Sequence, residues 1–188
     1  MDFPTRYDFF MTTAALSIHL QRELRSDHAG ELGAVFIYRG MRQVAKLRND
    51  KSLIAFAEAH GATEAKHLAA IETWLPASQR SMLLVPWCIA GWLTGALPAL
   101  FGSHAAYATV ASVETFVDQH YQQQIDHIQL NGGDTQLLAL LKECQADERH
   151  HREEAASLAG NASHFFIRVW CWLVGTGSAG AVVLARRI

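Results

Sequence analysis

Apolar residues recur at helical spacing along four long stretches of the chain. These cover residues 16–47, about 52–74, about 104–130 and about 135–158, and the chain's four prolines all lie outside them. Such spacing is typical of amphipathic helices that bury one face. The pattern predicts an all-α protein, with Ser52 as a candidate N-cap of the second helix.

Two short polar segments separate these helices in pairs. Residues 48–50 (Arg-Asn-Asp) and residues 131–134 (Asn-Gly-Gly-Asp) have compositions typical of turns. The helices would therefore form two hairpins, about 16–75 and about 104–159. We expect these hairpins to pack as a ferritin-like four-helix bundle in a single domain, residues 1–188.

The second helix of each hairpin carries an E-x-x-H motif: Glu64 with His67, and Glu148 with His151. Residues three apart lie about 60° apart around a helix, so each pair can reach one metal ion. A single motif of this kind is common on solvated helix surfaces. Two of them in one bundle match the ligand pattern of di-iron carboxylate proteins.

One further glutamate on each remaining helix completes that pattern. In an antiparallel hairpin, residues equidistant from the turn lie at the same height. Glu31 and Glu64 are equidistant from the first turn, and Glu114 and Glu148 are equidistant from the second. Each hairpin is therefore expected to bring a carboxylate level with its E-x-x-H motif.

The two hairpins also repeat one design. The offset between them is 83 residues for the glutamates of the first helices and 84 for those of the second helices. Tyr38 and Tyr121 each follow the first glutamate of a hairpin by seven residues, which is about two helical turns. Their phenols could hydrogen-bond to a ligand glutamate, although a tyrosine on such a face is more often a core residue.

Charge favours metal binding by this set of residues. Four carboxylates facing a bundle core repel one another and are costly to desolvate, whereas two divalent cations balance their charge. Carboxylate-rich ligation with one imidazole per metal suits iron or manganese better than zinc. The predicted ligands are Glu31, Glu64, His67, Glu114, Glu148 and His151.

Several neighbouring residues have an open role. Asp118 lies four residues after Glu114, so it could orient a ligand histidine or form a surface salt bridge. His28 could support the site or simply begin the ordered helix. His150 points about 100° away from its neighbour His151, which predicts solvent exposure.

Two further segments, about 82–101 and about 165–188, are apolar and approach the length of a bilayer span. Pro86, Pro98 and a glycine pair are expected to interrupt the first, and the glycine-rich run 175–180 to weaken the second. Their tryptophans suit a membrane–water interface, and an arginine pair near the end suits anionic headgroups. We expect both segments to lie on a membrane, with buried helices or an oligomer contact as the alternative.

Composition narrows the function classes. The chain has 188 residues, 50% of them hydrophobic and 18% charged, with a net charge of −2. That balance gives no general attraction for nucleic acid. Its three scattered cysteines form no zinc-ribbon or disulfide pattern, and a reducing compartment is the simpler expectation. The N-terminal stretch lacks the pattern of a secretory signal peptide.

In its ordered motifs the chain resembles the demethoxyubiquinone hydroxylases of ubiquinone biosynthesis. The resemblance covers roughly residues 24–188. It rests on the run Asp27-His28-Ala29-Gly30-Glu31-Leu32-Gly33-Ala34, Ile37-Tyr38, Glu64-x-x-His67, Pro86-Trp87 through Gly95-Ala96, Val113-Glu114 with His120-Tyr121, and Asp147-Glu148-x-x-His151.

The resemblance implies a di-iron bundle on a membrane that hydroxylates a polyprenylated benzoquinone with O₂. All six predicted ligands coincide with the family's iron ligands, and Glu64 and Glu148 would bridge the two ions. An external reductant, with NADH as a candidate, is implied too. The chain departs from the family at Leu32 and Thr115, where members often have a tyrosine and a second acid.

The expected partners are a lipid-soluble quinone, a membrane surface, and a second copy of the chain or other ubiquinone-biosynthesis proteins. The expected location is the cytoplasmic face of a bacterial inner membrane rather than a mitochondrial inner membrane. Two other functions stay open at this point. One is iron storage or peroxide detoxification in a ferritin- or rubrerythrin-like bundle, and the other is a non-catalytic quinone-binding assembly protein.

Overall fold

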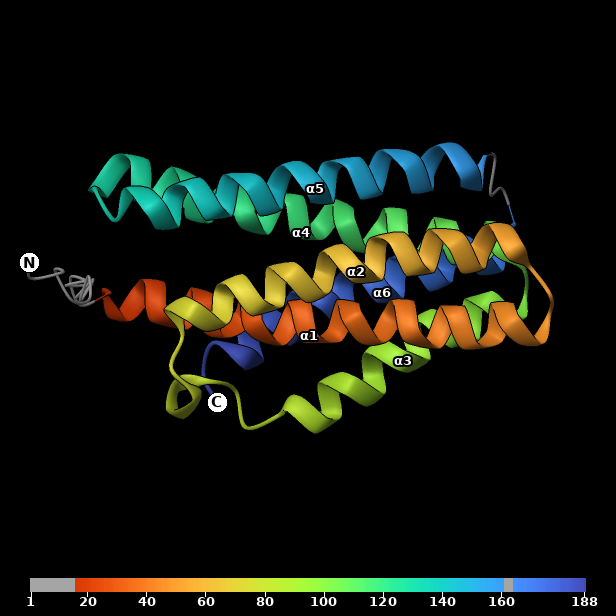
Figure 1. Cartoon of the computed structure of the whole chain (residues 1–188), viewed down its shortest axis with the longest axis horizontal. Helices are drawn as coiled ribbons and strands as arrows, with labels where there is room; N and C mark the ends of the chain where they lie inside the picture. Colours follow the sequence, from red (N-terminus) through yellow and green to blue (C-terminus); the bar gives the residue numbers. More distant parts are fainter. Residues whose placement is uncertain (1–15, 161–163) are drawn as a thin grey trace, which may run out of the picture.

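The computed structural model describes residues 16–160 and 164–188, which form long helices joined by short connections (Figure 1). Residues 1–15, on which the expectation about a signal peptide rests, lie outside the described part. The described residues contain no strand, which confirms the all-α prediction. The elements are α1 Ile18–Leu47, α2 Lys51–Trp74, the 3-10 turn η1 Ala77–Gln79, α3 Leu84–Leu100, α4 Ser103–Asn131, α5 Thr135–Ala159 and α6 Phe165–Ala185.

Helices α1 and α2 form the first hairpin, and residues 48–50 make its turn, as predicted. Asn49 adopts a left-handed conformation with φ of 55°, which asparagine tolerates better than most residues. The Asp50 side chain accepts a hydrogen bond of 3.0 Å from the Leu53 backbone N–H. Asp50 is therefore the N-cap of α2, and the prediction of Ser52 as this cap is wrong by two positions.

Helices α4 and α5 form the second hairpin. Gly132 takes a φ of 76° at the end of α4, a value that favours glycine. Asp134 then caps α5 by accepting hydrogen bonds from the backbone N–H groups of Gln136 and Leu137. The two hairpins pack together as the four-helix core, which confirms the predicted ferritin-like bundle.

The predicted interruptions of the two apolar segments are wrong. Helix α3 is continuous from Leu84 to Leu100 because Pro86 lies in its first turn, where no hydrogen bond is lost. Pro98 lies near its end. Helix α6 also runs unbroken through the glycine-rich residues 175–180, since tertiary packing outweighs weak helix propensity.

Helix α3 lies directly against α1, with the two backbones in contact. A Cβ atom built on Gly91 would meet the backbone oxygen of Gly33, and one on Gly95 would meet that of Ile37. Both pairs have an offset of 58 residues (91 − 33 and 95 − 37), so the two helices run parallel. Small residues therefore permit this close approach, as they do between membrane helices.

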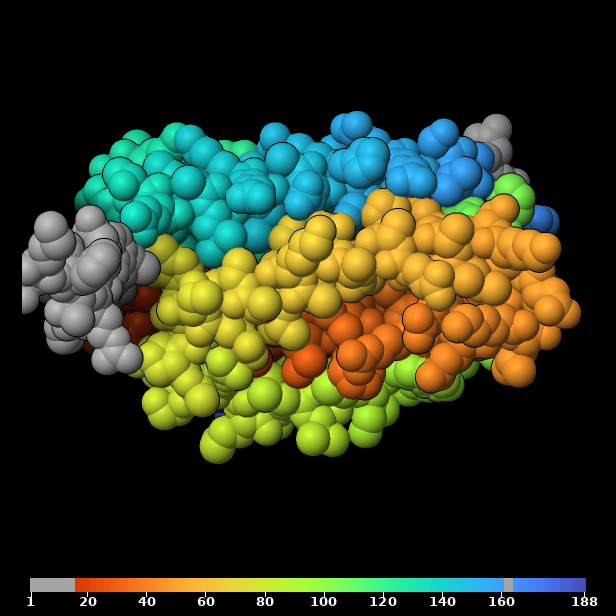
Figure 2. Space-filling model, viewed as in Figure 1, coloured from red at the N-terminus to blue at the C-terminus, as the bar shows by residue number. Residues whose placement is uncertain are grey.

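Apolar side chains of the core form two clusters along the bundle. One contains Tyr38, Met41, Phe56 and Val110, and the other contains Leu24, Ile71, Tyr121 and Leu141. Figure 2 shows one face of the bundle, along which side chains of α2 and α5 meet. Helices α3 and α6 pack against α1 and α4 instead.

Candidate metal centre

The six residues predicted as ligands come together from all four core helices. Glu31 lies on α1, Glu64 and His67 on α2, Glu114 on α4, and Glu148 and His151 on α5. Every one of them is at most 5% exposed. Burying four carboxylates costs several kcal/mol each unless positive charge balances them, so this cluster needs a charge partner.

The six side chains divide into two sets of four that can each surround one ion. The first set is Glu31, Glu64, His67 and Glu148, and within it the candidate ligand atoms lie within 4.8 Å of one another. The second is Glu64, Glu114, Glu148 and His151, at the same spacing. Glu64 and Glu148 belong to both sets, as required of carboxylates that bridge two ions.

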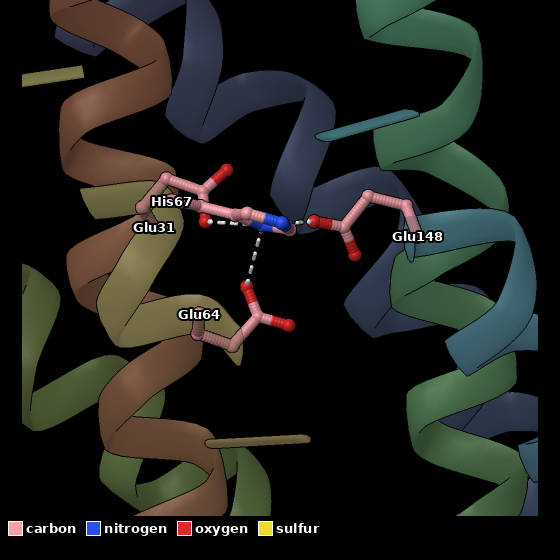
Figure 3. A group of neighbouring side chains, drawn as sticks. All are labelled: Glu31, Glu64, His67 and Glu148. Atoms are coloured by element: carbon pink, nitrogen blue, oxygen red, sulfur yellow. Dashed lines mark ion pairs between the residues drawn. The ribbon is translucent and has the colours of Figure 1, made fainter. Parts of the chain in front are cut away.

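The histidines face these carboxylates through Nδ1. His67 Nδ1 lies 3.6 Å from Glu31 Oε2 and 3.1 Å from Glu148 Oε1 (Figure 3). His151 Nδ1 lies 3.0 Å from Glu64 Oε1 and 3.4 Å from Glu148 Oε2. In both halves, therefore, an imidazole nitrogen points at the shared carboxylates.

The two tyrosines connect the halves of the bundle. Tyr38 on α1 donates a hydrogen bond of 3.2 Å to Glu114 Oε1 on α4. Tyr121 on α4 donates one to Glu31 Oε1 on α1. The expectation that these phenols could bond a ligand glutamate is confirmed, and each bond crosses to the opposite hairpin. This reciprocal pattern orients one carboxylate of each half.

Burial and neighbouring charges shift the pKa values of several residues in this cluster. Burial raises the pKa values of Glu64 and Glu114 well above their usual range, and Glu148 raises both further. Burial would lower the pKa of His67, but the neighbouring carboxylates of Glu148 and Glu31 raise it to about 11. Burial would raise the pKa of Glu148, yet the neighbouring imidazoles of His151 and His67 lower it to about 2.

The same side chains retain unused ligand atoms. Glu31 Oε2, Glu64 Oε1, both Glu148 oxygens and Nδ1 of His67 and His151 are buried without a hydrogen-bond partner in the described residues. Buried polar atoms are almost always bonded, so a set of orphans on one centre indicates an additional ligand. The donor set of oxygens and imidazole nitrogens fits two iron or manganese ions.

Asp147 supports His67 from behind. Its Oδ2 lies 3.0 Å from His67 Nε2, so it can fix the ring with Nδ1 facing the centre. By its spacing from Glu114, Asp118 was the other candidate for such a role. The Asp118 carboxylate instead bonds Arg149 and Arg152. The sequence feature that could have identified Asp147 as the partner of His67 is its position immediately before the second E-x-x-H motif.

Other histidines near the centre have partners of their own. His150 is exposed, as predicted, whereas His28 is buried and bonds Glu72 at 3.1 Å. His60 was given no role in the sequence analysis. It stacks edge-on against His151 with ring centroids 4.2 Å apart, and its Nε2 bonds Glu154 at 3.0 Å. The two candidate ligand histidines therefore have different surroundings.

A cavity of about 440 Å³ leads to the centre between α1, α3, α4 and α6. Its walls are mostly apolar, with Ile37, Val113, Phe116 and Leu173 among them, and glycines of α1 and α3. Four of the six candidate ligands also line it: Glu31, Glu64, Glu114 and Glu148. The volume suits a substituted aromatic ring with part of an apolar chain.

Comparison with known proteins places the chain in a family. Residues 18–185 match the family model described as "Ubiquinone biosynthesis protein COQ7". A Caenorhabditis elegans protein named "NADPH-dependent 3-demethoxyubiquinone 3-hydroxylase, mitochondrial" is 29% identical over 182 residues, 94% of this chain and 95% of that protein. A Rhodospirillum rubrum protein named "3-demethoxyubiquinol 3-hydroxylase" is 36% identical over 137 residues, 71% of this chain and 62% of that protein. The chain belongs to the COQ7 family of ubiquinone biosynthesis proteins.

Proposed function

We propose that this protein is a di-iron monooxygenase that hydroxylates the ring of a polyprenylated demethoxyubiquinol. The observation that carries the proposal is that four carboxylates of the candidate metal centre line an apolar cavity. An iron-storage bundle has no need for such a cavity. A hydroxylase needs one, because its substrate ring must reach the metals while its prenyl chain stays out of water.

Glu31, Glu64, His67, Glu114, Glu148 and His151 would hold the two ions. Iron, when bound, supplies the activation of O₂ and the redox chemistry of hydroxylation. The protein's own contribution is to balance the charge of the ions, orient the ligand side chains and exclude water from the site. Tyr38 and Tyr121 hold Glu114 and Glu31 in place, and the flanking apolar clusters exclude water.

Purified protein loaded with Fe(II) tests this function. Given a short-chain demethoxyubiquinol, a reductant and ¹⁸O₂, it should release the hydroxylated quinol carrying one ¹⁸O atom. We propose a nicotinamide as the electron source, because the Caenorhabditis elegans relative is named NADPH-dependent; NADH and NADPH should be compared. Product whose added oxygen comes from H₂¹⁸O would contradict monooxygenase chemistry.

Metal binding should release protons. Raised pKa values favour the protonated forms of Glu64, Glu114 and His67. Ligation requires these atoms to be deprotonated, so Mn²⁺ should displace protons from them, and its affinity should rise with pH. Calorimetric titrations in two buffers of different ionisation enthalpy measure the release. Equal heats in both buffers would contradict the predicted protonation.

Replacing Asp147 by alanine should weaken metal binding by about 10- to 100-fold. The His67 ring would lose the 3.0 Å contact that sets its orientation. Glu143→Ala is the matched control, since Glu143 is an exposed acid on the same helix. Mn²⁺ titrations of both variants check this result. Equal affinities for the two would show that Asp147 does not support the site.

We also propose that the protein lies on a membrane, with α3 and α6 as its contact surface. Helix α6 is long and apolar enough to cross a bilayer by length and composition, and α3 is shorter. Both flank the cavity. Their exposed apolar side chains include Val85, Ile89, Leu93, Leu97, Leu100, Phe165, Phe166, Trp172 and Leu173.

Arg186 is not free for lipid headgroups in this arrangement, because its guanidinium bonds Glu23 at 2.7 Å. The neighbouring Arg187 is exposed, so one arginine of the predicted pair stays available to headgroups. Some relatives have "mitochondrial" in their names, and others come from bacteria. For this chain we propose the cytoplasmic face of a bacterial inner membrane.

The double substitution Leu93→Ser and Trp172→Ser should release the protein from phospholipid vesicles. Each exposed apolar side chain contributes about 1.5–3 kcal/mol when buried, so the loss of affinity should be about tenfold or more per residue. Leu130→Ser is the control, because Leu130 is an exposed leucine outside α3 and α6, next to the C-terminus of α4. Vesicle flotation measures binding. Equal flotation of both variants would exclude this surface.

A further inference from the structure

A polar group of side chains lies at one end of the cavity, beside the metal centre and separate from it. Asp27 on α1 lines the cavity, and its side chain has no solvent exposure. Asp27 lies one helical turn before Glu31 on the same face of α1, about 6 Å along the axis. A ring held at Asp27 would therefore lie next to the metal ligands.

The Asp27 carboxylate is fixed through one of its oxygens. Oδ1 accepts hydrogen bonds from His120 Nε2 at 2.9 Å and from Gln124 Nε2 at 2.8 Å, both on α4. Oδ2 is buried and has no hydrogen-bond partner in the described residues. A buried carboxylate oxygen left unpaired is costly, so Oδ2 is an acceptor that lacks its donor.

Trp87 on α3 offers the complementary group. Its indole lines the same cavity, and its Nε1–H is buried without an acceptor in the described part of the chain. Trp87 lies one helical turn before Gly91, whose contact on α1 is Gly33. One unpaired donor and one unpaired acceptor therefore line the same cavity.

The geometry points to Asp27 and Trp87 as the residues that recognise the oxygen substituents of the substrate ring. Asp27 Oδ2 accepts a hydrogen bond from a ring hydroxyl, and the Trp87 indole donates one to a second ring oxygen. The assignment rests on the proposed function. It adds that the reduced form of the substrate, the quinol, binds in preference to the quinone. A quinol has hydroxyl donors for Asp27, whereas a quinone has only acceptors.

This recognition explains two buried orphan groups with a single ligand. An aromatic hydrocarbon without oxygen substituents would leave both groups unpaired. Its affinity should therefore be much lower than that of the quinol. The preference for a ring hydroxyl should therefore be about tenfold to a hundredfold in affinity.

Equilibrium binding to the metal-loaded protein without O₂ tests the assignment. The probes are a short-chain demethoxyubiquinol, the corresponding quinone, and the dimethyl ether of the quinol, which keeps the shape of the ring but has no donor. The variants are Asp27→Leu and Trp87→Phe. Thr94→Val is the control, because Thr94 lines the same cavity but its hydroxyl already bonds the Ala90 backbone oxygen at 2.9 Å.

The wild type and Thr94→Val should bind the quinol at least about tenfold more tightly than the dimethyl ether. Asp27→Leu should lose this preference, and Trp87→Phe should weaken all three probes. Wild type that binds the ether or the quinone as tightly as the quinol overturns the assignment without any variant. Quinol binding that survives both substitutions also overturns it. If the wild type binds none of the three probes, the proposed function itself fails.

Discussion

Replacing Glu148 by glutamine should abolish two-metal binding and hydroxylation together. Glu148 is the carboxylate to which both histidines point, at 3.1 Å from His67 and 3.4 Å from His151. It belongs to both candidate ion sets. A neutral amide keeps the size of the side chain but removes one anionic oxygen from each set. Metals contribute several kcal/mol to such reactions, so the rate should fall by about a thousandfold or more.

Iron content per chain and quinol turnover measure this effect. Glu143→Gln makes the same chemical change at an exposed position of α5 and should leave both values unchanged. A folded Glu148→Gln protein that holds two iron ions and turns over at the normal rate would show that Glu148 is not a shared ligand.

Replacing Gly95 by alanine should destabilise the protein severely. Alanine is favoured over glycine in a helix by about 1 kcal/mol, so helix propensity alone predicts a gain. The added methyl group, however, would overlap the backbone oxygen of Ile37. Backbone atoms cannot move aside as a flexible side chain can, so α3 must separate from α1. We expect a net loss of about 3 kcal/mol or more.

The free energy of unfolding in urea measures this loss. Gly177→Ala is the matched control, since a Cβ at Gly177 meets nothing within 4 Å, and it should stabilise α6 slightly. The displacement of α3 should also distort the cavity, because Gly91 and Trp87 line its wall. If Gly95→Ala is as stable as Gly177→Ala, the close contact between α1 and α3 is not present in solution.

Much of the bundle could be predicted from sequence because its features are periodic. The spacing of apolar residues located all four core helices, and the turns at 48–50 and 131–134 set the height of each glutamate relative to its motif. Within a hairpin, the position of a residue along the helix axis follows from its number of residues from the turn. This is why the six side chains that the structure brings together could be named from the sequence.

Contacts between distant helices could not be predicted in the same way. The glycine pair of α3 looked like an interruption, because a sequence does not show which helix it will face. The pair is instead the contact surface for α1. Asp147 and Asp118 each lie near a candidate ligand in sequence, and only the packing of α5 against α2 brings Asp147 to His67. Trp87 likewise acquires a role only when α3 is placed beside α1.

The most direct test of the hydroxylase assignment is the quinone content of cells that lack this protein. We predict that demethoxyubiquinone accumulates and ubiquinone is lost. The wild-type chain should restore ubiquinone, and the Glu148→Gln variant should not. An unchanged quinone pool, with altered cellular iron content instead, would contradict the assignment and favour iron storage.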